Sequence, residues 1–96
     1  MRLALALLVL GAPPLAAQLV VSPSGPYTDV ASAVRAARPG DRVVIRAGTY
    51  RTEDVVVDRR VELVGEGRAV LDAGGEHQVL VVRADSVVVR GLVFRN

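Results

Sequence analysis

The chain has 96 residues, of which 51% are hydrophobic, and it contains no cysteine, no tryptophan and only three aromatic side chains. This composition argues against intrinsic disorder and excludes disulfides and thiolate chemistry, and its twenty valines favour strands because a β-branched side chain fits a pleated surface. A formal net charge of +2, from twelve arginines and no lysine against ten acidic residues, is too small and scattered for a nucleic-acid-binding or membrane-surface protein.

Residues 1–17 predict a secretory signal peptide. One basic residue, Arg2, precedes the apolar run Leu3–Leu10, a Gly-Ala-Pro-Pro break follows, and small residues flank an expected cut after Ala17. The run Leu3–Leu10 is shorter than the ~20 apolar residues that a membrane-spanning helix needs. The alternative to a cleaved signal peptide is an uncleaved anchor. We therefore expect a mature chain that begins at Gln18, is exported to the periplasm or the medium, and keeps no membrane span.

Residues 18–40 predict a strand, a loop and one short helix. The first apolar run ends in a segment rich in Pro, Gly and Ser, which is typical of a loop. Apolar residues then recur with helical spacing and predict a helix over residues 29–38. Thr28 or Asp29 is expected to cap its N-terminus, and Pro39-Gly40 is expected to end it.

Residues 41–96 consist of short aliphatic runs separated by polar or glycine turns, and part of the pattern repeats. Val57 matches Val82 with an offset of 25 residues, and Gly65 matches Gly91 with an offset of 26. The polar and glycine turns between the aliphatic runs are too short to contain crossover helices. Successive strands are therefore expected to turn corners and to stack on the equivalent strand one coil later. The spacing predicts an all-β solenoid, a parallel β-helix.

Alternation along these runs separates two faces of each strand. The core-lining residues are expected to be Val55, Val57, Val61, Leu63, Val87, Val89, Leu92 and Phe94. On the opposite face we expect Val56, Glu62, Val88 and Val93.

Four segments carry a family resemblance, in this order: Ala36–Tyr50, Val61–Gly65, Val70–Gly75 and Val87–Asn96. Together they resemble the opening coils of the right-handed parallel β-helix superfamily, also called pectin-lyase-like. Within this superfamily, the sequence of these segments is most similar to the NosD-like proteins, which are periplasmic factors implicated in maturing the copper centres of nitrous oxide reductase. The resemblance implies copper as the metal of the family, and a copper enzyme and transport machinery as partners.

Several residues have structural interpretations within such a coil stack. Helix 29–38 is expected to cover the open N-terminal end, which otherwise exposes an apolar interior. Gly48 and Gly65 are suited to corners that require positive φ or close approach of two backbones. Asn96 is expected in an inward turn position, where its amide bonds to neighbouring coils.

Asp72, Glu76 and His77 form the one local cluster with metal-ligand side chains. The surrounding Asp-Ala-Gly-Gly sequence is typical of a turn, and the solvated turn is the interpretation we favour over a metal site. A copper site is poorly supported, because the expected mature chain has one histidine and neither methionine nor cysteine. We therefore predict no metal-ligating or cofactor-binding residue in this chain.

Carboxylates for glycoside or lyase chemistry form no recognisable constellation, since neighbours along a strand point to opposite faces. The candidates are Glu53, Asp54, Asp58, Glu62 and Asp72, with Glu53 and Asp54 interpreted as a turn and Glu62 as an outward charge beside Arg59, Arg60 or a stacked residue. Arginines that stack on one face would bind an acidic polysaccharide, but solubility and pairing with acids between rungs is the favoured interpretation. These are Arg42, Arg46, Arg51, Arg59, Arg60, Arg68, Arg83, Arg90 and Arg95.

Solenoids need about three repeats and a cap at each end, whereas residues 41–96 supply about two coils and no second cap. We therefore expect a truncated N-terminal fragment whose last rung, Leu92–Phe94, presents an unpaired edge and an exposed core, with aggregation or dimerisation as the consequence. The leading functional hypothesis is an exported NosD-like binding and maturation factor. The alternatives are a polysaccharide lyase, epimerase or hydrolase with its active site beyond residue 96, and a surface adhesin, since fold alone does not choose among them.

Overall fold

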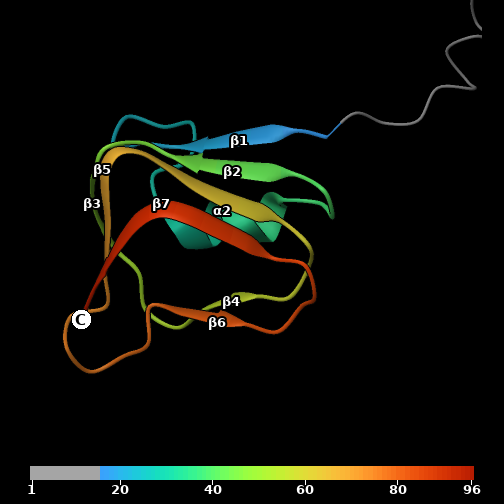
Figure 1. Cartoon of the computed structure of the whole chain (residues 1–96). Helices are drawn as coiled ribbons and strands as arrows, with labels where there is room; N and C mark the ends of the chain where they lie inside the picture. The colour runs from blue at the N-terminus through green and yellow to red at the C-terminus, as the bar shows by residue number, and fades with distance from the viewer. Residues whose placement is uncertain (1–15) are drawn as a thin grey trace, which may run out of the picture.

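The computed structural model describes residues 16–96, so the predicted signal peptide 1–17 lies almost entirely outside the described residues. The chain is mostly β, with parallel strands stacked as a solenoid of about three turns and one short helix (Figure 1). Its elements are β1 (Gln18–Val21), α2 (Val30–Ala36), β2 (Arg42–Ile45), β3 (Gly48–Arg51), β4 (Val55–Val57), β5 (Glu62–Asp72), β6 (Leu80–Val82) and β7 (Val88–Arg95).

All strand pairs between these elements are parallel, and each joins one coil to the next. β2 pairs with β1, the first half of β5 pairs with β2, and β7 pairs with β5. The second half of β5 pairs with β3, while β6 pairs with β4 in a separate two-stranded sheet. Val57 lies opposite Val82 in this register, as the sequence repeat predicted. The parallel solenoid therefore follows from the spacing of the valine runs.

Gly65 and Gly91 meet where the coils turn a corner. A Cβ atom at Gly65 would collide with the carbonyl oxygen of Gly91, and Gly91 has a φ of 73°. Gly48, at the start of β3, has a φ of 148°. The two corner glycines that the sequence singled out thus have the predicted reasons for being glycine, namely close backbone approach at Gly65 and positive φ at Gly48.

The core is aliphatic, and the predicted inward face is confirmed for the middle coils. Val57 and Leu63 are completely buried, and the predicted outward residue Val56 is 42% exposed. Phe94 aligns with buried Leu71 but is 48% exposed, in line with the exposed core expected at the last rung, Leu92–Phe94. Its side chain follows the inward column, but none of the described strands stacks beyond β7 to cover it.

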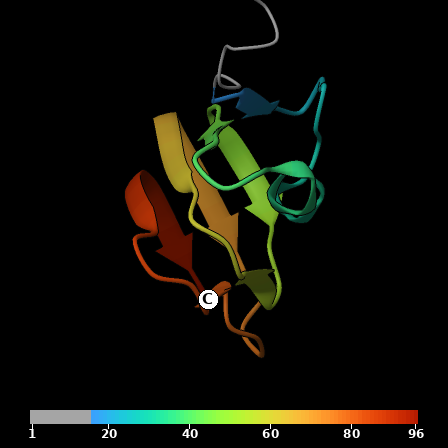
Figure 2. The same ribbon diagram turned by 90° about the vertical axis from the view of Figure 1, so that its right-hand side faces the viewer.

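The helix α2 packs on the stack as expected, but it is shorter than predicted. The Asp29 carboxylate accepts a hydrogen bond from the Ser32 amide at 2.7 Å and caps the N-terminus. The helix ends at Ala36 rather than Arg38, since the chain is already extended at the C-cap residue Ala37. Pro39 restricts its direct neighbour Arg38 to extended conformations, so the helix does not resume there. Figure 2 shows α2 at one end of the stack and β7 at the other.

Arg59 supplies a contact at the other end of α2 that the sequence analysis did not predict. Its guanidinium donates to the carbonyl oxygens of Arg35 and Ala37 at 3.2 and 2.9 Å. A cation is favourable at a helix C-terminus, where the last carbonyls lack partners within the helix. Arg59 therefore ties the helix to the coil that carries β4. Within residues 16–96, no helix has the length and hydropathy that crossing a membrane requires.

Candidate functional site

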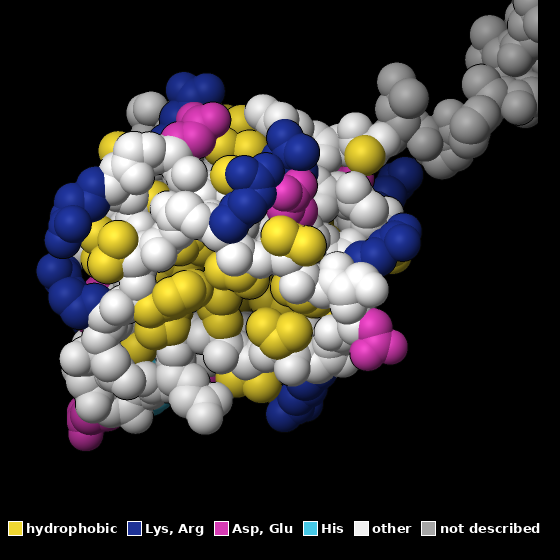
Figure 3. All heavy atoms as spheres, viewed as in Figure 1, with side chains coloured by type: hydrophobic (Ala, Val, Ile, Leu, Met, Phe, Trp, Pro, Cys, Tyr) yellow, Lys and Arg dark blue, Asp and Glu magenta, His cyan; other side chains and the backbone are white. Residues whose placement is uncertain are grey.

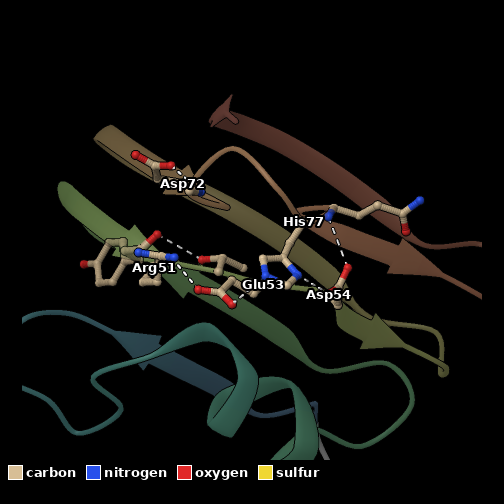
Figure 4. A network of polar contacts seen from close by, with 9 residues as sticks. Arg51, Glu53, Asp54, Asp72 and His77 are labelled. Atoms are coloured by element: carbon tan, nitrogen blue, oxygen red, sulfur yellow. Dashed lines mark hydrogen bonds and ion pairs between the residues drawn. The ribbon is translucent and has the colours of Figure 1, made fainter.

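A network of polar contacts surrounds His77, in the turn between β5 and β6 (Figure 4). The Nδ1 atom of His77 lies 2.9 Å from a carboxylate oxygen of Asp54, and the Nε2 atom lies 3.4 Å from a carboxylate oxygen of Glu53. Both acids come from the turn between β3 and β4, one coil earlier. The imidazole thus sits between two carboxylates that belong to the neighbouring rung.

Backbone contacts fix this arrangement. The Asp54 carboxylate accepts from the Gln78 amide at 3.1 Å, and the Asp54 amide donates to the Gln78 carbonyl at 2.6 Å. Asp54 has a φ of 52°, a left-handed conformation that aspartate tolerates better than most residues. Glu53 in turn forms an ion pair with Arg51. The network holds two successive coils together at one corner of the solenoid.

The chemistry that this network allows is limited by its own hydrogen bonds. Both ring nitrogens of His77 already face a carboxylate. The nearby hydroxyl of Thr52 is buried and donates to the carbonyl of Tyr50 at 3.1 Å. In the part of the chain that the structure describes, no three His, Asp or Glu side chains are grouped to hold a metal ion. The arrangement orients an imidazole and links two coils.

The structure separates the three residues that the sequence places together as ligand types. Asp72 accepts from the Gly74 amide at 2.8 Å and pairs with Arg95 at 3.0 Å, so it closes the turn that the sequence predicted. The Gly74 N–H and the Arg95 guanidinium lower the pKa of Asp72. Glu76 is exposed, and His77 turns to the previous coil instead. The coil offset that aligns Val57 with Val82 also places Asp54 near His77, and this signal was available in the sequence.

A ladder of alternating charge runs along the outer face of the main sheet. Glu62 on β5 pairs with Arg42 on β2 at 2.8 Å and with Arg90 on β7 at 2.9 Å. Hydrogen bonds from Arg42 and Arg90 lower the pKa of Glu62. Pairing between rungs, the favoured interpretation of the arginines, is confirmed here.

A second ladder follows the same order on the other half of the sheet. Asp72 lies opposite Arg51 on β3 and Arg95 on β7, and it forms its ion pair with Arg95. In each ladder one carboxylate lies between two arginines. Arg51 also has an ion pair of its own with Glu53, so only in the first ladder do two guanidinium groups share one carboxylate.

Asp41 forms a third polar cluster, at the end of the stack that carries the helix. Its carboxylate accepts from the Ala17 and Arg38 amides, both at 2.8 Å, and the residue is only 6% exposed. Those two N–H groups, with Arg38 the larger influence, lower the pKa of Asp41. A cavity of about 500 Å³ lies beside it, lined among others by Leu19, Tyr27 and Pro39. Sequence reasoning treated Asp41 only as the start of the strand region.

The opposite end of the stack is apolar. Val82 and Phe94 are each 48% exposed, and Leu80, Val89 and Leu92 are partly buried against the core from the same side. Figure 3 shows hydrophobic side chains gathered at the centre of this face, with arginine side chains toward its margin. This surface is called the open end below.

Comparisons with known proteins assign no family to this chain. No protein-family model, no curated protein sequence and no solved structure matches this chain. The parallel solenoid is therefore established by the register of its strands, and function is argued from its surfaces.

Proposed function

We propose that the chain is a binding module of an exported right-handed parallel β-helix protein, and that it acts as a NosD-like maturation factor for a periplasmic copper enzyme. The observation that carries this proposal is the stacking of the motif segments: Glu62–Gly65 pairs with Arg42–Ile45, and Glu62–Val64 pairs with Val88–Arg90. These are the segments on which the resemblance rests. A rigid stack of this kind presents a broad surface for a partner protein.

In this role the chain supplies shape rather than ligands. The side chains that chemistry would require are engaged in structure: His77 links two coils, and Asp72 closes a turn. Copper would accordingly be held by the partner enzyme or by other parts of the maturation machinery.

The proposal is tested in the native host by deleting the gene and measuring the copper content of purified nitrous oxide reductase. We expect the reductase to accumulate with its copper centres depleted, and a plasmid copy of the gene to restore them. A reductase with full copper content in the deletion strain would overturn the proposal.

A second candidate, recognition of an acidic polysaccharide, is favoured by one observation. Arg42 and Arg90 lie on the same outer face, with 48% and 58% of their side chains exposed, and share a single carboxylate. A guanidinium group presents five N–H donors in a fixed geometry, so several remain for an anionic polymer.

This candidate is tested by the affinity of the purified chain for polygalacturonate compared with dextran. We expect Arg42→Gln combined with Arg90→Gln to weaken binding to the acidic polymer, while Arg83→Gln, outside the ladder, leaves it unchanged. Equal binding to the two polymers would argue against polysaccharide recognition.

A further inference from the structure

The inference concerns the capped end, where Asp41 meets the residues that flank the expected processing site. It rests on the export that the proposed function includes. We propose that processing cuts the chain between Ala16 and Ala17, one residue before the cut expected from the sequence, and that the new α-ammonium group of Ala17 forms an ion pair with Asp41. Asp41 is then the binding site for the mature N-terminus.

Ala17 belongs to the folded stack although it precedes β1. Its amide donates to the Asp41 carboxylate at 2.8 Å, and its carbonyl oxygen accepts from the Arg42 amide at 3.0 Å. The second bond continues the parallel register in which Gln18 lies opposite Arg42. Of the described residues, Ala17 is the first in the chain that hydrogen-bonds to the stack. A cut before Ala17 therefore keeps all of these contacts.

A cut after Ala17 removes both contacts. Asp41 is only 6% exposed, and its other donor is the Arg38 amide at 2.8 Å. Without Ala17, one carboxylate oxygen of Asp41 loses its donor and the Arg42 amide loses its acceptor. A nearly buried carboxylate that loses a hydrogen bond keeps the cost of its desolvation. Both cuts leave an alanine before the cleaved bond, which suits a signal-peptide cleavage site, but the fold favours the earlier one.

The charge of the new terminus also suits this site. The cut converts the Ala17 amide, 2.8 Å from a carboxylate oxygen, into an ammonium group, so a neutral hydrogen bond becomes a stronger, charge-assisted one. An ammonium group has three N–H donors, and the cavity of about 500 Å³ beside Ala17 and Asp41 has room for water at the other two. Asp41 is the one acid among the described residues that line this cavity.

The position of the cut is tested on the protein purified from its native host, by N-terminal sequencing and intact mass. We expect Ala17 to be the first residue. A chain that starts at Gln18, or at the pyroglutamate that an N-terminal glutamine forms by losing ammonia, would overturn the inference. A cut at any other bond, or an uncut chain, would do the same.

The composition allows a direct test of the ion pair. The chain contains no lysine, so the α-ammonium group is its only primary amine. An N-hydroxysuccinimide ester of acetic acid acylates amines only in their unprotonated form, and its reaction rate therefore reports how firmly the protein holds the charged form. The reference is a synthetic peptide of residues 17–22, whose amine has no partner. At neutral pH we expect the mature chain to react about tenfold more slowly than the peptide.

Matched variants connect the slow reaction to the carboxylate. Asp41→Asn keeps an oxygen acceptor but removes the charge, and its amine is expected to react at the rate of the peptide. Asp85→Asn, in an exposed turn before β7, is expected to react as slowly as the unaltered chain. Circular dichroism checks that Asp41→Asn is folded, and the comparison of the unaltered chain with the peptide decides the question even when it is not.

A second pH value separates charge from steric shielding. At pH ~10 most α-amino groups are unprotonated, so the rates of the mature chain and the peptide are expected to converge. A difference that persists there would mean that the amine is merely covered, and equal rates at neutral pH would mean that it has no partner; either result contradicts the ion pair. The copper content of the reductase is measured separately, so the proposed function and this inference fail independently.

Discussion

The two ends of the solenoid are built from the same kind of valine-rich sequence but have opposite surfaces. At the capped end, Val34 of α2 is 1% exposed, whereas Val82 of β6 at the open end is 48% exposed. The difference does not lie in the strands, because β6 and β7 align in register with buried strands of the previous coil. It lies in whether another layer covers the rung, and only α2 provides such a layer within residues 16–96.

The capped end is also closed by polar contacts around the helix. Asp29 caps the start of α2, Arg59 binds its last carbonyls, and Asp41 joins the chain before β1 to the residues after the helix. Among the described residues, no buried side-chain nitrogen or oxygen lacks a hydrogen-bond partner. The capped end is therefore a completed surface, and the comparison can be tested by disturbing each end in turn.

The largest difference is expected from a charge placed at one valine of each end. Val34→Asp buries a carboxylate under α2 and is expected to cost at least about 3 kcal/mol of unfolding free energy. Val82→Asp places the same group on the half-exposed open end and is expected to cost less than about 1 kcal/mol. Urea unfolding of both variants measures the difference between the two losses of unfolding free energy. Similar losses at the two sites would mean that the open end is covered in solution.

A smaller effect is expected at Asp41, and it depends on pH. Because hydrogen bonds from Arg38 and Ala17 hold the pKa of Asp41 below its ordinary value, its ionised form stabilises the fold above the unfolded pKa. That stabilisation is lost as the pH falls through the folded-state pKa. We therefore expect Asp41→Asn to lower the melting temperature at neutral pH, with the gap from the unaltered chain shrinking near pH ~3.

The control for this prediction is Asp85→Asn, at an exposed turn of the open end. It is expected to leave the melting temperature nearly unchanged at both pH values. A gap for Asp41→Asn that is as large in acid as at neutral pH would contradict the role assigned to the carboxylate.

Removal of the helix cap is expected to lower the free energy of unfolding by about 1 kcal/mol. Asp29→Ala removes the acceptor for the Ser32 amide and leaves the first turn of α2 without its cap. The matched variant is Asp58→Ala, which removes an exposed carboxylate next to Arg59. Urea unfolding is expected to show the loss for Asp29 alone, and equal losses would mean that charge rather than capping is responsible.

Much of the architecture was predictable because it depends on local periodicity. The offset between Val57 and Val82 predicted which strands pair, and Asp29 was one of the two residues predicted to cap the helix. The end of the helix was misplaced by two residues: the restriction that Pro39 imposes on its neighbour explains Arg38, but the extended backbone of Ala37 follows from no local signal. Periodicity predicts which face of a strand points inward, whereas the exposure of Phe94 was expected from the number of coils, which leaves the last rung of the given sequence uncovered.

The polar clusters were harder to predict because they join coils. Asp72, Glu76 and His77 are close in sequence, but His77 contacts Glu53 and Asp54 one coil earlier. Sequence spacing groups residues that are neighbours along the chain, whereas a solenoid brings together residues of successive coils. The pairing of Arg59 with the end of α2 has the same character, and no local pattern marks it.

The smallest effect is expected at the charge ladder, which spans the outer face between the two ends. Glu62→Gln leaves Arg42 and Arg90 facing each other without the carboxylate that now lies between them. Salt screens both the attraction in the unaltered chain and the repulsion in the variant. The difference between the melting temperatures of the two proteins should therefore be largest at low ionic strength and should shrink as salt is added. Glu66→Gln, which removes a looser contact to Arg46 at 3.7 Å, is expected to show almost no such dependence. A difference for Glu62→Gln that stays constant with salt would mean that packing of the side chain, rather than its charge, stabilises the ladder.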